Sequence, residues 1–372
     1  ASPVASQLLE GGGGLLRMDR CKDLAARSGG FDALRCRCAL MASAVEALAC
    51  HLEYARELSS TELKAVASPP PGKSAMDHTR TILSFGSRTP GRPGWEKTQE
   101  YITGTMRGLG WVVEEDKFEA DTPLGKVAMR NVIASFHPEG GECIVDVSAH
   151  LDSKYEPHYE FLGATDSAAP VGMMLAAAQV LTPALQTHLA AAGDMPCLRM
   201  VFFDGEEAYA EWSDTDSTYG ARHLAAEWAK SPARFGEGAS RLASMRTLML
   251  LDLLGNPRPS LTWQFGNTKP LFARMQSVEQ RMRVLKLVVA EGAAGGALLT
   301  SGTATTEQRG TISDDHLPFL HLGIPILHLI AAPFPAVWHT ERDNLSALDP
   351  STVNALGAIL TATLAEIYAL NL

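Results

Sequence analysis

Acidic and histidine side chains follow several apolar segments that are typical of buried strands. They are His150 and Asp152 after the segment ending at Ala149, Asp204, Glu206 and Glu207 after Phe203, Asp252 beside Leu250, and His339, which Trp338 precedes, in the loop after Ile330. Asp166 stands just ahead of a predicted helix that has Pro170 in its first turn. Ligands of open α/β sheets bind beyond the carboxyl ends of the strands, so we expect these groups at one edge of a sheet.

A cation would balance these carboxylates, because ionised groups beside apolar strands are rarely tolerated without partners. Asp, Glu and His ligands without thiolates suit zinc, and suit manganese or magnesium less well. Each group also has a plainer explanation: Asp166 as a helix N-cap, His339 as an ordinary histidine, and Glu206-Glu207 as a solvated loop. All three explanations would have to coincide at one sheet edge, so the pattern favours a metal site.

The adjacent glutamates Glu206 and Glu207 can divide the chemistry between them. Consecutive side chains after a strand point in different directions, so one can bind a metal while the other stays free as a general base. This division suits amide chemistry, in which a metal polarises the carbonyl and a carboxylate moves a proton.

The elements that must position these groups alternate between strands and helices. Strands are predicted at 111–118, 129–136, 143–149, 198–203, 247–254 and 324–330, and helices at 95–109, 170–181, 219–230 and 350–370. Such alternation predicts an α/β fold, a three-layer sandwich with a central mixed, mostly parallel sheet flanked by helices.

A helical N-terminal extension is predicted for residues 1–68. Apolar residues recur at helix spacing between Leu40 and Leu58, and three prolines at 69–71 end this region because they cannot continue a helix. We assign residues 74–372 to a zinc-dependent catalytic domain.

Composition excludes several classes of protein. The chain has 372 residues, of which 46% are hydrophobic and 20% charged, as in ordinary globular proteins and unlike disordered or fibrous ones. A net charge of −10 disfavours binding to nucleic acid or an anionic membrane. We expect no membrane span and no signal segment in this chain, since its longest apolar run, 171–181, is typical of a buried helix.

The six cysteines leave their pairing open. Cys21, Cys36, Cys38 and Cys50 form either two disulfides or four buried thiols, and the lack of a CxxC pair argues against a zinc ribbon. Cys143 and Cys197 stand near the starts of two predicted strands, and they can pair only if those strands are neighbours.

Six ordered segments between about residue 74 and the C-terminus resemble the glutaminyl-peptide cyclotransferases, or glutaminyl cyclases, which are related to zinc aminopeptidases. The segments are GATDSA at 163–168, FFDGEEA at 202–208, STYGARHLAA at 217–226, LLDL at 250–253, DDHLPF at 314–319 and PFPAVWHT at 333–340. The resemblance implies an enzyme that converts the N-terminal glutamine of peptides or proteins to pyroglutamate and releases ammonia. N-terminal glutamate is an open alternative.

The resemblance also implies a role for each site residue. One zinc per chain would be held by Asp166, Glu207 and His339. Glu206 would be the general acid/base, and Asp252 and Asp314 a hydrogen-bonded carboxylate pair near the substrate amine. The pocket for the glutamine side chain would be walled by Trp212, Phe334 and Trp338.

This sequence departs from the family at two places. Ala149 and Val171 replace the cysteines that form a disulfide in the animal members, and Ser313 replaces a glutamine beside the substrate. Because the family generally works in the secretory pathway, we expect a secretory or extracellular location.

A two-zinc aminopeptidase is the alternative, with His150, Asp166 and Asp252 as ligands of a second metal. The Asp314-Asp315-His316 run and Trp338 favour the cyclase. A degenerate binding module is a third class, disfavoured because every candidate ligand and base is present.

Overall fold

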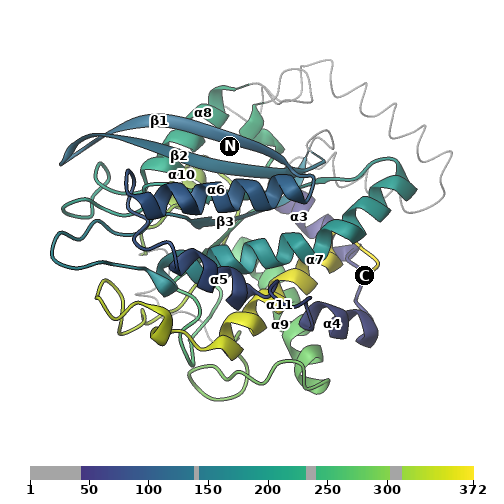
Figure 1. Ribbon diagram of the computed structural model, residues 1–372. Coiled ribbons are helices and arrows are strands. Elements are labelled where there is room, and N and C mark those ends of the chain that lie inside the picture. Colours follow the sequence, from purple (N-terminus) through teal and green to yellow (C-terminus); the bar gives the residue numbers. More distant parts are fainter. Residues whose placement is uncertain (1–42, 138–141, 232–239, 302–311) are drawn as a thin grey trace.

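A six-stranded sheet of order β1-β2-β4-β3-β5-β6 forms the centre of the molecule (Figure 1). The computed structural model describes residues 43–137, 142–231, 240–301 and 312–372. The pairs β1–β2 and β2–β4 are antiparallel, whereas β4, β3, β5 and β6 run parallel to one another. The predicted mixed, mostly parallel sheet is confirmed.

The elements in the described residues follow one another along the chain. The strands are β1 (Val112–Thr122), β2 (Gly125–Phe136), β3 (Cys143–His150), β4 (Cys197–Phe203), β5 (Leu248–Asp252) and β6 (Ile326–Ile330). The α-helices are α3 (Ala44–Glu53), α4 (Ser60–Ala67), α5 (Ala75–Leu83), α6 (Pro93–Gly108), α7 (Ala169–Ala192), α8 (Tyr219–Lys230), α9 (Lys269–Val284), α10 (Leu317–His321) and α11 (Pro350–Ile367).

Helices cover both faces of the sheet, which gives the predicted three layers (Figure 1). On β4, Met200 and Phe202 belong to the core that contains α7 and α11, whereas Val201 and Phe203 belong to a second core that contains α8. Alternate residues of a strand face opposite sides of the sheet, so burial on both sides explains why this strand is apolar throughout.

Three helices of the described residues, α5, α9 and the short α10, were not predicted, and α7 extends well beyond its predicted end at residue 181. In α9 the buried positions include Leu271, Met275, Val278 and Met282, which is helix spacing, but charged residues fill much of the rest of the segment. A helix of this kind packs through one apolar stripe. In a sequence, such a stripe is a weaker signal than the continuous apolar segment of a buried strand.

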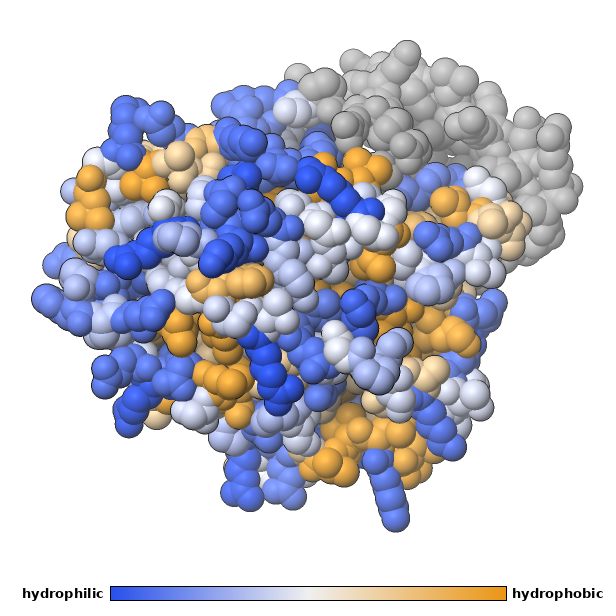
Figure 2. All heavy atoms as spheres, viewed as in Figure 1, coloured by the Kyte–Doolittle hydropathy of each residue, from blue (hydrophilic) through white to orange (hydrophobic). Residues whose placement is uncertain are grey.

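One helical stretch, Ala164–Ala192, is long and apolar enough to cross a membrane by length and composition alone. Of its most apolar window, 83% is buried inside the protein, as in the core helix of a globular domain. Hydrophilic residues cover much of the face shown in Figure 2, with smaller hydrophobic areas between them.

The helices α3 and α4 share the core of the rest of the chain. Leu48, Leu52, Leu58 and Leu63 are buried in the same cluster as α7 and α11. The buried carboxylate of Glu366 in α11 accepts a hydrogen bond from the backbone N–H of Leu58 at 2.8 Å. Residues 1–42 lie outside the described part, so the division into an extension and a catalytic domain stays a prediction.

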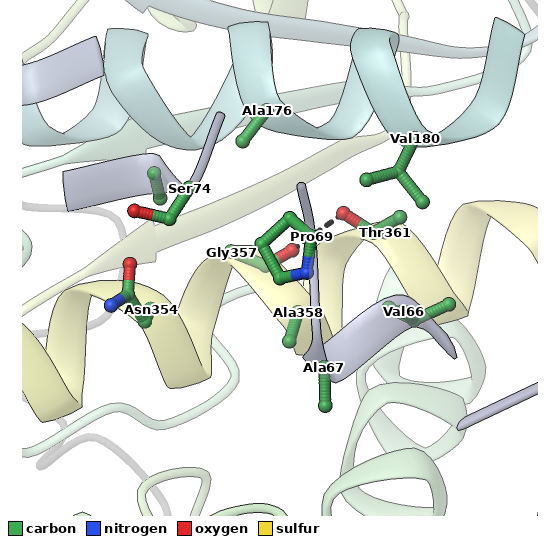
Figure 3. Close-up of a pocket in the computed structure, with 11 residues that line it drawn as sticks. Val66, Ala67, Pro69, Ser74, Ala176, Val180, Asn354, Gly357, Ala358 and Thr361 are labelled. Carbon is green, nitrogen blue, oxygen red and sulfur yellow. Dashed lines mark hydrogen bonds between the residues drawn. The ribbon is translucent and has the colours of Figure 1, made fainter. Parts of the chain in front are cut away.

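A small pocket lies between α4, α7 and α11, with Val66, Val180 and Ala358 among its lining residues (Figure 3). Its lining contains apolar side chains, hydroxyls and one amide, but no carboxylate, histidine or cysteine. The pocket therefore lacks the groups that the predicted chemistry needs.

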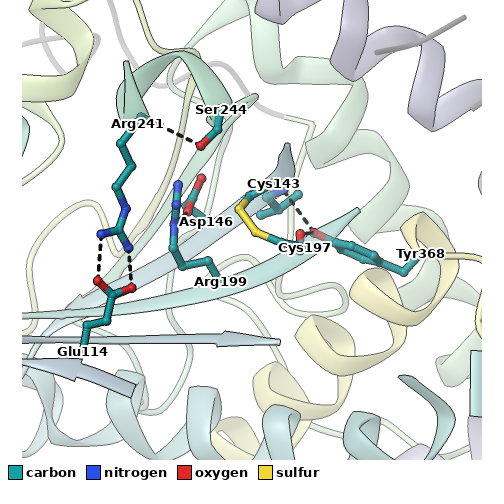
Figure 4. Close-up of a disulfide and its surroundings, with 9 residues drawn as sticks. Glu114, Cys143, Asp146, Cys197, Arg199, Arg241, Ser244 and Tyr368 are labelled. Carbon is teal, nitrogen blue, oxygen red and sulfur yellow. Dashed lines mark hydrogen bonds and ion pairs between the residues drawn. A yellow bond between two sulfur atoms is a disulfide. The ribbon is translucent and has the colours of Figure 1, made fainter. Parts of the chain in front are cut away.

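Cys143 and Cys197 are paired across β3 and β4, with a Cα–Cα distance of 4.6 Å (Figure 4). These strands are parallel neighbours in register at the two cysteines, so the condition for pairing is met. The disulfide lies where the strands begin, opposite the end that carries His150. Cys50 is also disulfide-bonded, whereas Cys21, Cys36 and Cys38 lie outside the described residues.

Candidate metal centre

The carboxyl ends of the parallel strands and the loops after them meet at one edge of the sheet. The groups found there are His150 at the end of β3, Glu206 and Glu207 after β4, Asp252 at the end of β5, His339 after β6, and Asp166 in the irregular turn Ala164–Ala168 before α7. The expected convergence is therefore observed.

Asp166, Glu207 and His339 form a compact cluster in which one ligand atom of each lies within 4.8 Å of the others. His339 Nε2 is 3.4 Å from Asp166 Oδ2 and 3.3 Å from Glu207 Oε2. Asp166 Oδ2 and both carboxylate oxygens of Glu207 are buried without a hydrogen-bond partner. Buried carboxylate oxygens need a donor or a cation, so the cluster is suited to hold a metal.

The donor set fits zinc. Two carboxylates and one imidazole give three protein ligands, as in catalytic zinc sites that keep a fourth position open. Burial acts to lower the pKa of His339, but its contacts with Asp166 and Glu207 outweigh this and raise the pKa to about 10. Without a metal, the protonated His339 supplies the balancing charge.

Asp166 is positioned by the turn that precedes α7. A Cβ at Gly163 would lie 2.0 Å from the carbonyl oxygen of Asp166, and Gly163 has a φ of 53°. Only glycine fits such a close approach without a shift of the backbone. The Asp343 carboxylate accepts hydrogen bonds from the backbone N–H and the hydroxyl of Thr165, which fixes the same turn from the other side.

Glu206 and Glu207 are positioned through their backbones. The carboxylate of Asp152 accepts the N–H of Glu206 at 3.2 Å and that of Glu207 at 3.3 Å. The N–H of Thr218, the residue before α8, donates to the carbonyl of Glu206 at 2.7 Å. Of the two carboxylates, that of Glu207 contributes a ligand atom to the cluster with Asp166 and His339.

His339 is held by aromatic neighbours. The hydroxyl of Tyr159 donates to its backbone carbonyl at 3.0 Å. The ring of Phe161 meets the imidazole edge-on with centroids 6.0 Å apart, and Trp338 stacks on it at 4.1 Å. These contacts fix the ring plane that a metal would require.

Glu206 is buried, and burial raises the pKa of its carboxyl well above the ordinary value. The nearby carboxylates of Glu207, Asp314 and Asp315 raise it further, whereas His150 acts in the opposite direction. A carboxyl with a raised pKa can accept and return a proton near neutral pH.

Asp252 and Asp314 are buried close to each other, but each has partners of its own. Asp252 Oδ1 accepts from the hydroxyl of Ser167 and the N–H of Leu253, and Asp314 Oδ2 lies 2.7 Å from His328 Nε2. Burial, with the charge of Asp314, raises the pKa of Asp252 to about 6. Burial also acts to raise the pKa of Asp314, but His328 outweighs it and the pKa is lowered.

Two of the three aromatic residues assigned to the substrate pocket are in contact with each other. Phe334 and Trp338 meet edge-on with centroids 4.9 Å apart, directly beside His339. Trp338 and Trp212 are each 40% exposed. Trp212 lies in a separate loop, which the carboxylate of Asp216 holds by accepting three backbone N–H groups.

This architecture and sequence occur in known proteins. The sequence model of peptidase family M28 matches residues 131–364. A glutaminyl-peptide cyclotransferase from Drosophila melanogaster is 42% identical over 281 residues, which cover 73% of this chain and 75% of that protein. The chain belongs to the glutaminyl-peptide cyclotransferase family. The crystal structure of Macrostomum lignano glutaminyl cyclase matches with a TM-score of 0.74 at 32% identity, covering 85% of this chain and 95% of that one.

As a member of the glutaminyl-peptide cyclotransferase family, the chain is an enzyme. Its fold is shared with a Zn-dependent exopeptidase from Parabacteroides distasonis, at a TM-score of 0.60 and 20% identity over 81% of this chain and 99% of that one. Together with the Asp166, Glu207 and His339 cluster, the M28 context points to zinc as the metal.

A second group of ligand-type side chains adjoins the first in this cyclotransferase. His150 Nε2 lies 2.9 Å from Asp166 Oδ1 and 3.5 Å from Asp252 Oδ1, and His150 Nδ1 lies 3.4 Å from Asp152. Burial acts to lower the pKa of His150, but these three carboxylates raise it well above the ordinary value. The imidazolium therefore supplies the positive charge at this second position.

Asp204 stands at the same sheet edge but takes no part in the cluster. Its carboxylate accepts from the indole N–H of Trp95 at 3.0 Å and from the backbone N–H of Arg130 at 2.6 Å, and it thereby ties the end of β4 to α6 and β2. The sequence placed Asp204 correctly but could not show which way its side chain points.

Several supporting residues were missed by the sequence reasoning. They are Arg88, Tyr159, His328 and Asp343. His328 left a signal, because a histidine inside the buried strand β6 needs a partner. Arg88, Tyr159 and Asp343 lie in loops with no periodicity, and their partners are distant in the sequence.

Proposed function

We propose that this enzyme converts the N-terminal glutamine of peptides and proteins to pyroglutamate and releases ammonia, with one zinc ion held by Asp166, Glu207 and His339. One observation carries the proposal: ligand atoms of these three residues lie within 4.8 Å of one another, and the residue next to Glu207, Glu206, has a buried carboxyl, in a member of this family. A candidate metal ligand, Glu207, and a candidate base, Glu206, are thus adjacent in the same chain segment.

Glu206 is the proton carrier of this reaction. Bound zinc would polarise the side-chain carbonyl of the substrate glutamine. As the α-amine nitrogen bonds to that carbonyl carbon, Glu206 accepts its proton. Glu206 then returns the proton to the side-chain nitrogen, the old carbon–nitrogen bond breaks, and ammonia leaves. The carboxylate is regenerated, and no water is consumed.

Asp252 and Asp314 are assigned to the substrate amine. Ser167 and the N–H of Leu253 hold one oxygen of Asp252, and His328 holds one oxygen of Asp314. Asp252 keeps a second oxygen that can orient the amine toward the side chain, and the second oxygen of Asp314 accepts the N–H of Asp315 at 2.6 Å with a further lone pair for the amine. Such orientation of two groups in one molecule accounts for a large part of the rate of a ring closure.

Trp212, Phe334 and Trp338 are assigned to the pocket that takes the glutamine side chain. Phe334 and Trp338 already pack together next to the metal ligand His339. An aromatic pocket excludes water and so disfavours hydrolysis. It also favours the conformation in which the glutamine side chain folds back onto the amine.

A two-zinc aminopeptidase is the second candidate, because His150, Asp166 and Asp252 also form a group with ligand atoms within 4.8 Å of one another. Four contacts support the single-zinc enzyme instead. His150 Nε2 is engaged with Asp166, His150 Nδ1 lies beside Asp152, and Asp252 Oδ1 already accepts two hydrogen bonds.

Zinc stoichiometry combined with a peptide assay tests the proposal. The purified enzyme should hold one zinc per chain and convert a glutamine-initiated peptide to a product that has lost ammonia, as measured by mass spectrometry. The same peptide starting with alanine is the control and should stay unchanged. Two tightly held zinc ions, with release of free alanine, would establish the aminopeptidase.

The disulfides support the further proposal that the enzyme works in the secretory pathway or outside the cell. Cys143–Cys197 is formed and Cys50 is disulfide-bonded, and such bonds persist mainly in oxidising compartments. Thiol labelling of the enzyme isolated from its natural source should find Cys143 and Cys197 unreactive; labelled thiols there would contradict this location.

A further inference from the structure

Arg88 is a fully buried arginine beside the metal centre. It lies in the segment between α5 and α6, and its exposed fraction is 0%. The backbone N–H of Arg88 donates to the hydroxyl oxygen of Ser153 at 2.8 Å, and the hydroxyl of Thr89 donates to the carbonyl of Ser153 at 3.1 Å. The segment that carries Arg88 is thus fixed to the loop that follows β3.

The guanidinium of Arg88 donates to five backbone carbonyls. They belong to Leu151 and Asp152 after β3, to Leu162 and Gly163 at the start of the irregular turn, and to Asp166 itself. Nε is 2.9 Å from the carbonyl oxygen of Leu151, and Nη2 is 3.3 Å from that of Asp166. One side chain therefore joins the end of β3 to the segment that carries a metal ligand.

These contacts reach two of the three predicted ligands. Arg88 bonds directly to the backbone of Asp166, and it bonds to the backbone of Asp152, whose carboxylate accepts the N–H groups of Glu206 and Glu207. The acceptors of Arg88 lie in the loop after β3 and in the irregular turn before α7, and the carbonyl of Gly163 also accepts the N–H of Ala168 at 3.1 Å. Without the guanidinium, the carbonyls of Leu151 and Asp152 in the loop would lose a donor.

The charge of Arg88 also matches its surroundings. Burial lowers its pKa to about 10, while the nearby carboxylates of Asp152, Asp166, Asp343 and Glu207 act to raise it, so it stays charged at neutral pH. A planar guanidinium can serve five acceptors in a fixed geometry, whereas a lysine ammonium has three donors on a single nitrogen. The site therefore needs an arginine, and charge alone does not suffice.

We propose that Arg88 is a positioning residue that holds the Asp166 and Glu207 segments in their metal-binding arrangement before the metal binds. It acts on the affinity for zinc in two ways: through the backbone of Asp166, and through Asp152, whose carboxylate accepts the N–H of Glu207. It touches neither the metal nor the substrate.

The test is the zinc dissociation constant of the full-length Arg88→Lys enzyme, measured by competition with a chromogenic chelator. Lysine keeps the buried charge but leaves carbonyls without donors, and we expect the dissociation constant to rise by about 10- to 100-fold, the usual effect of losing a residue that orients a metal ligand. This readout does not depend on which reaction the enzyme catalyses, so failure of the cyclase assay would leave it intact.

Arg199→Lys is the matched control. Arg199 is also buried and is ion-paired with the buried Asp146, but it lies near the opposite end of the strands, close to the disulfide (Figure 4). This variant should lose thermal stability and keep its zinc dissociation constant within about twofold of the parent's. An unchanged constant in Arg88→Lys, or an equal rise in both variants, would overturn the proposal.

Ser153→Ala is the second test of the proposed role of Arg88, for the case that the Arg88→Lys enzyme does not fold. It keeps the guanidinium and removes the hydroxyl that accepts the N–H of Arg88 and donates to the carbonyl of Phe161 at 3.3 Å. A several-fold rise in the zinc dissociation constant is expected, and a constant equal to that of the parent would contradict the role of Arg88.

Discussion

At the scale of single residues, His339 acts as either a cation or a metal ligand, but not as both at once. Its imidazole contacts Asp166 and Glu207, and in the metal-free cluster these contacts raise its pKa to about 10. Only the neutral imidazole can bind zinc, so zinc must displace the proton. Metal binding and proton release are therefore coupled at this residue.

The zinc affinity should rise with pH. Below the pKa of about 10, His339 of the metal-free protein is protonated and binding releases that proton, so the affinity should increase about tenfold per pH unit between pH 6 and 8. Isothermal titration in two buffers of different ionisation enthalpy measures the released proton. In His339→Ala, zinc binding should be much weaker and should release about one proton fewer; the same proton release as the parent would show that another group carries it.

Glu206→Gln separates proton transfer from metal binding. Glutamine keeps the shape of the side chain but cannot accept the proton, so turnover should fall by about 100-fold or more while the zinc content stays at the parent level. Activity is followed by ammonia release and zinc by atomic emission. Full activity would remove Glu206 from the proton-transfer role, and loss of zinc would make it a ligand instead.

The charged residues proposed for the site could be predicted from the sequence, but the residues that hold them in place could not. Glu206, Asp252 and His150 stand next to apolar strands, where a charge is conspicuous without any knowledge of the fold. Arg88 and Asp343 act through backbone groups of distant segments, and nothing in their local sequence indicates those contacts.

At the scale of elements, the irregular turn before α7 carries the most demanding geometry of the site. Gly163 has a φ of 53°, and its Cα lies so close to the turn that a Cβ would meet the carbonyl oxygen of Asp166 at 2.0 Å. The position of Asp166, a proposed metal ligand, thus depends on the absence of a side chain at Gly163.

Gly163→Ala should therefore displace Asp166 and weaken zinc binding by about 10-fold or more. Gly193→Ala is the control, because Gly193 has a similar φ of 74° but open space where the methyl group would go. Both variants should lose about 1–2 kcal/mol of unfolding free energy from the left-handed backbone, but only Gly163→Ala should also lose zinc affinity. Equal zinc affinities in the two variants would show that the close contact at Gly163 is tolerated.

Elements were predicted best where burial is most complete. The strands β3 and β4 are buried along their whole length and were placed within a residue or two. The helices α5 and α9 were missed because they are anchored by one face and carry polar residues elsewhere. The three parallel strand pairs followed from the alternation with helices, whereas the strand order depends on long-range packing that the sequence pattern does not encode.

At the scale of the whole molecule, one end of the sheet carries the proposed chemistry and the other end carries stabilising contacts. The carboxyl ends of the parallel strands carry the proposed metal site. The opposite end carries the Cys143–Cys197 disulfide, the Arg199–Asp146 ion pair and the hydroxyl of Tyr368, which donates to the carbonyl of Cys197 at 2.6 Å (Figure 4). Stability and chemistry should then respond to different substitutions.

The double variant Cys143→Ala/Cys197→Ala tests this separation. The bond closes a loop with a sequence separation of 54 residues, and removing such a constraint from the unfolded chain should lower the unfolding free energy by about 4 kcal/mol. Turnover and the zinc dissociation constant should stay within about twofold of the parent's at temperatures where both proteins are folded, since the metal ligands lie at the other end of the strands. Denaturant unfolding and chelator competition on the same samples give both quantities. A large loss of zinc affinity without loss of stability would mean that the two ends of the sheet are coupled. The strands β3 and β4, which are buried on both faces, would then transmit the effect from one end to the other.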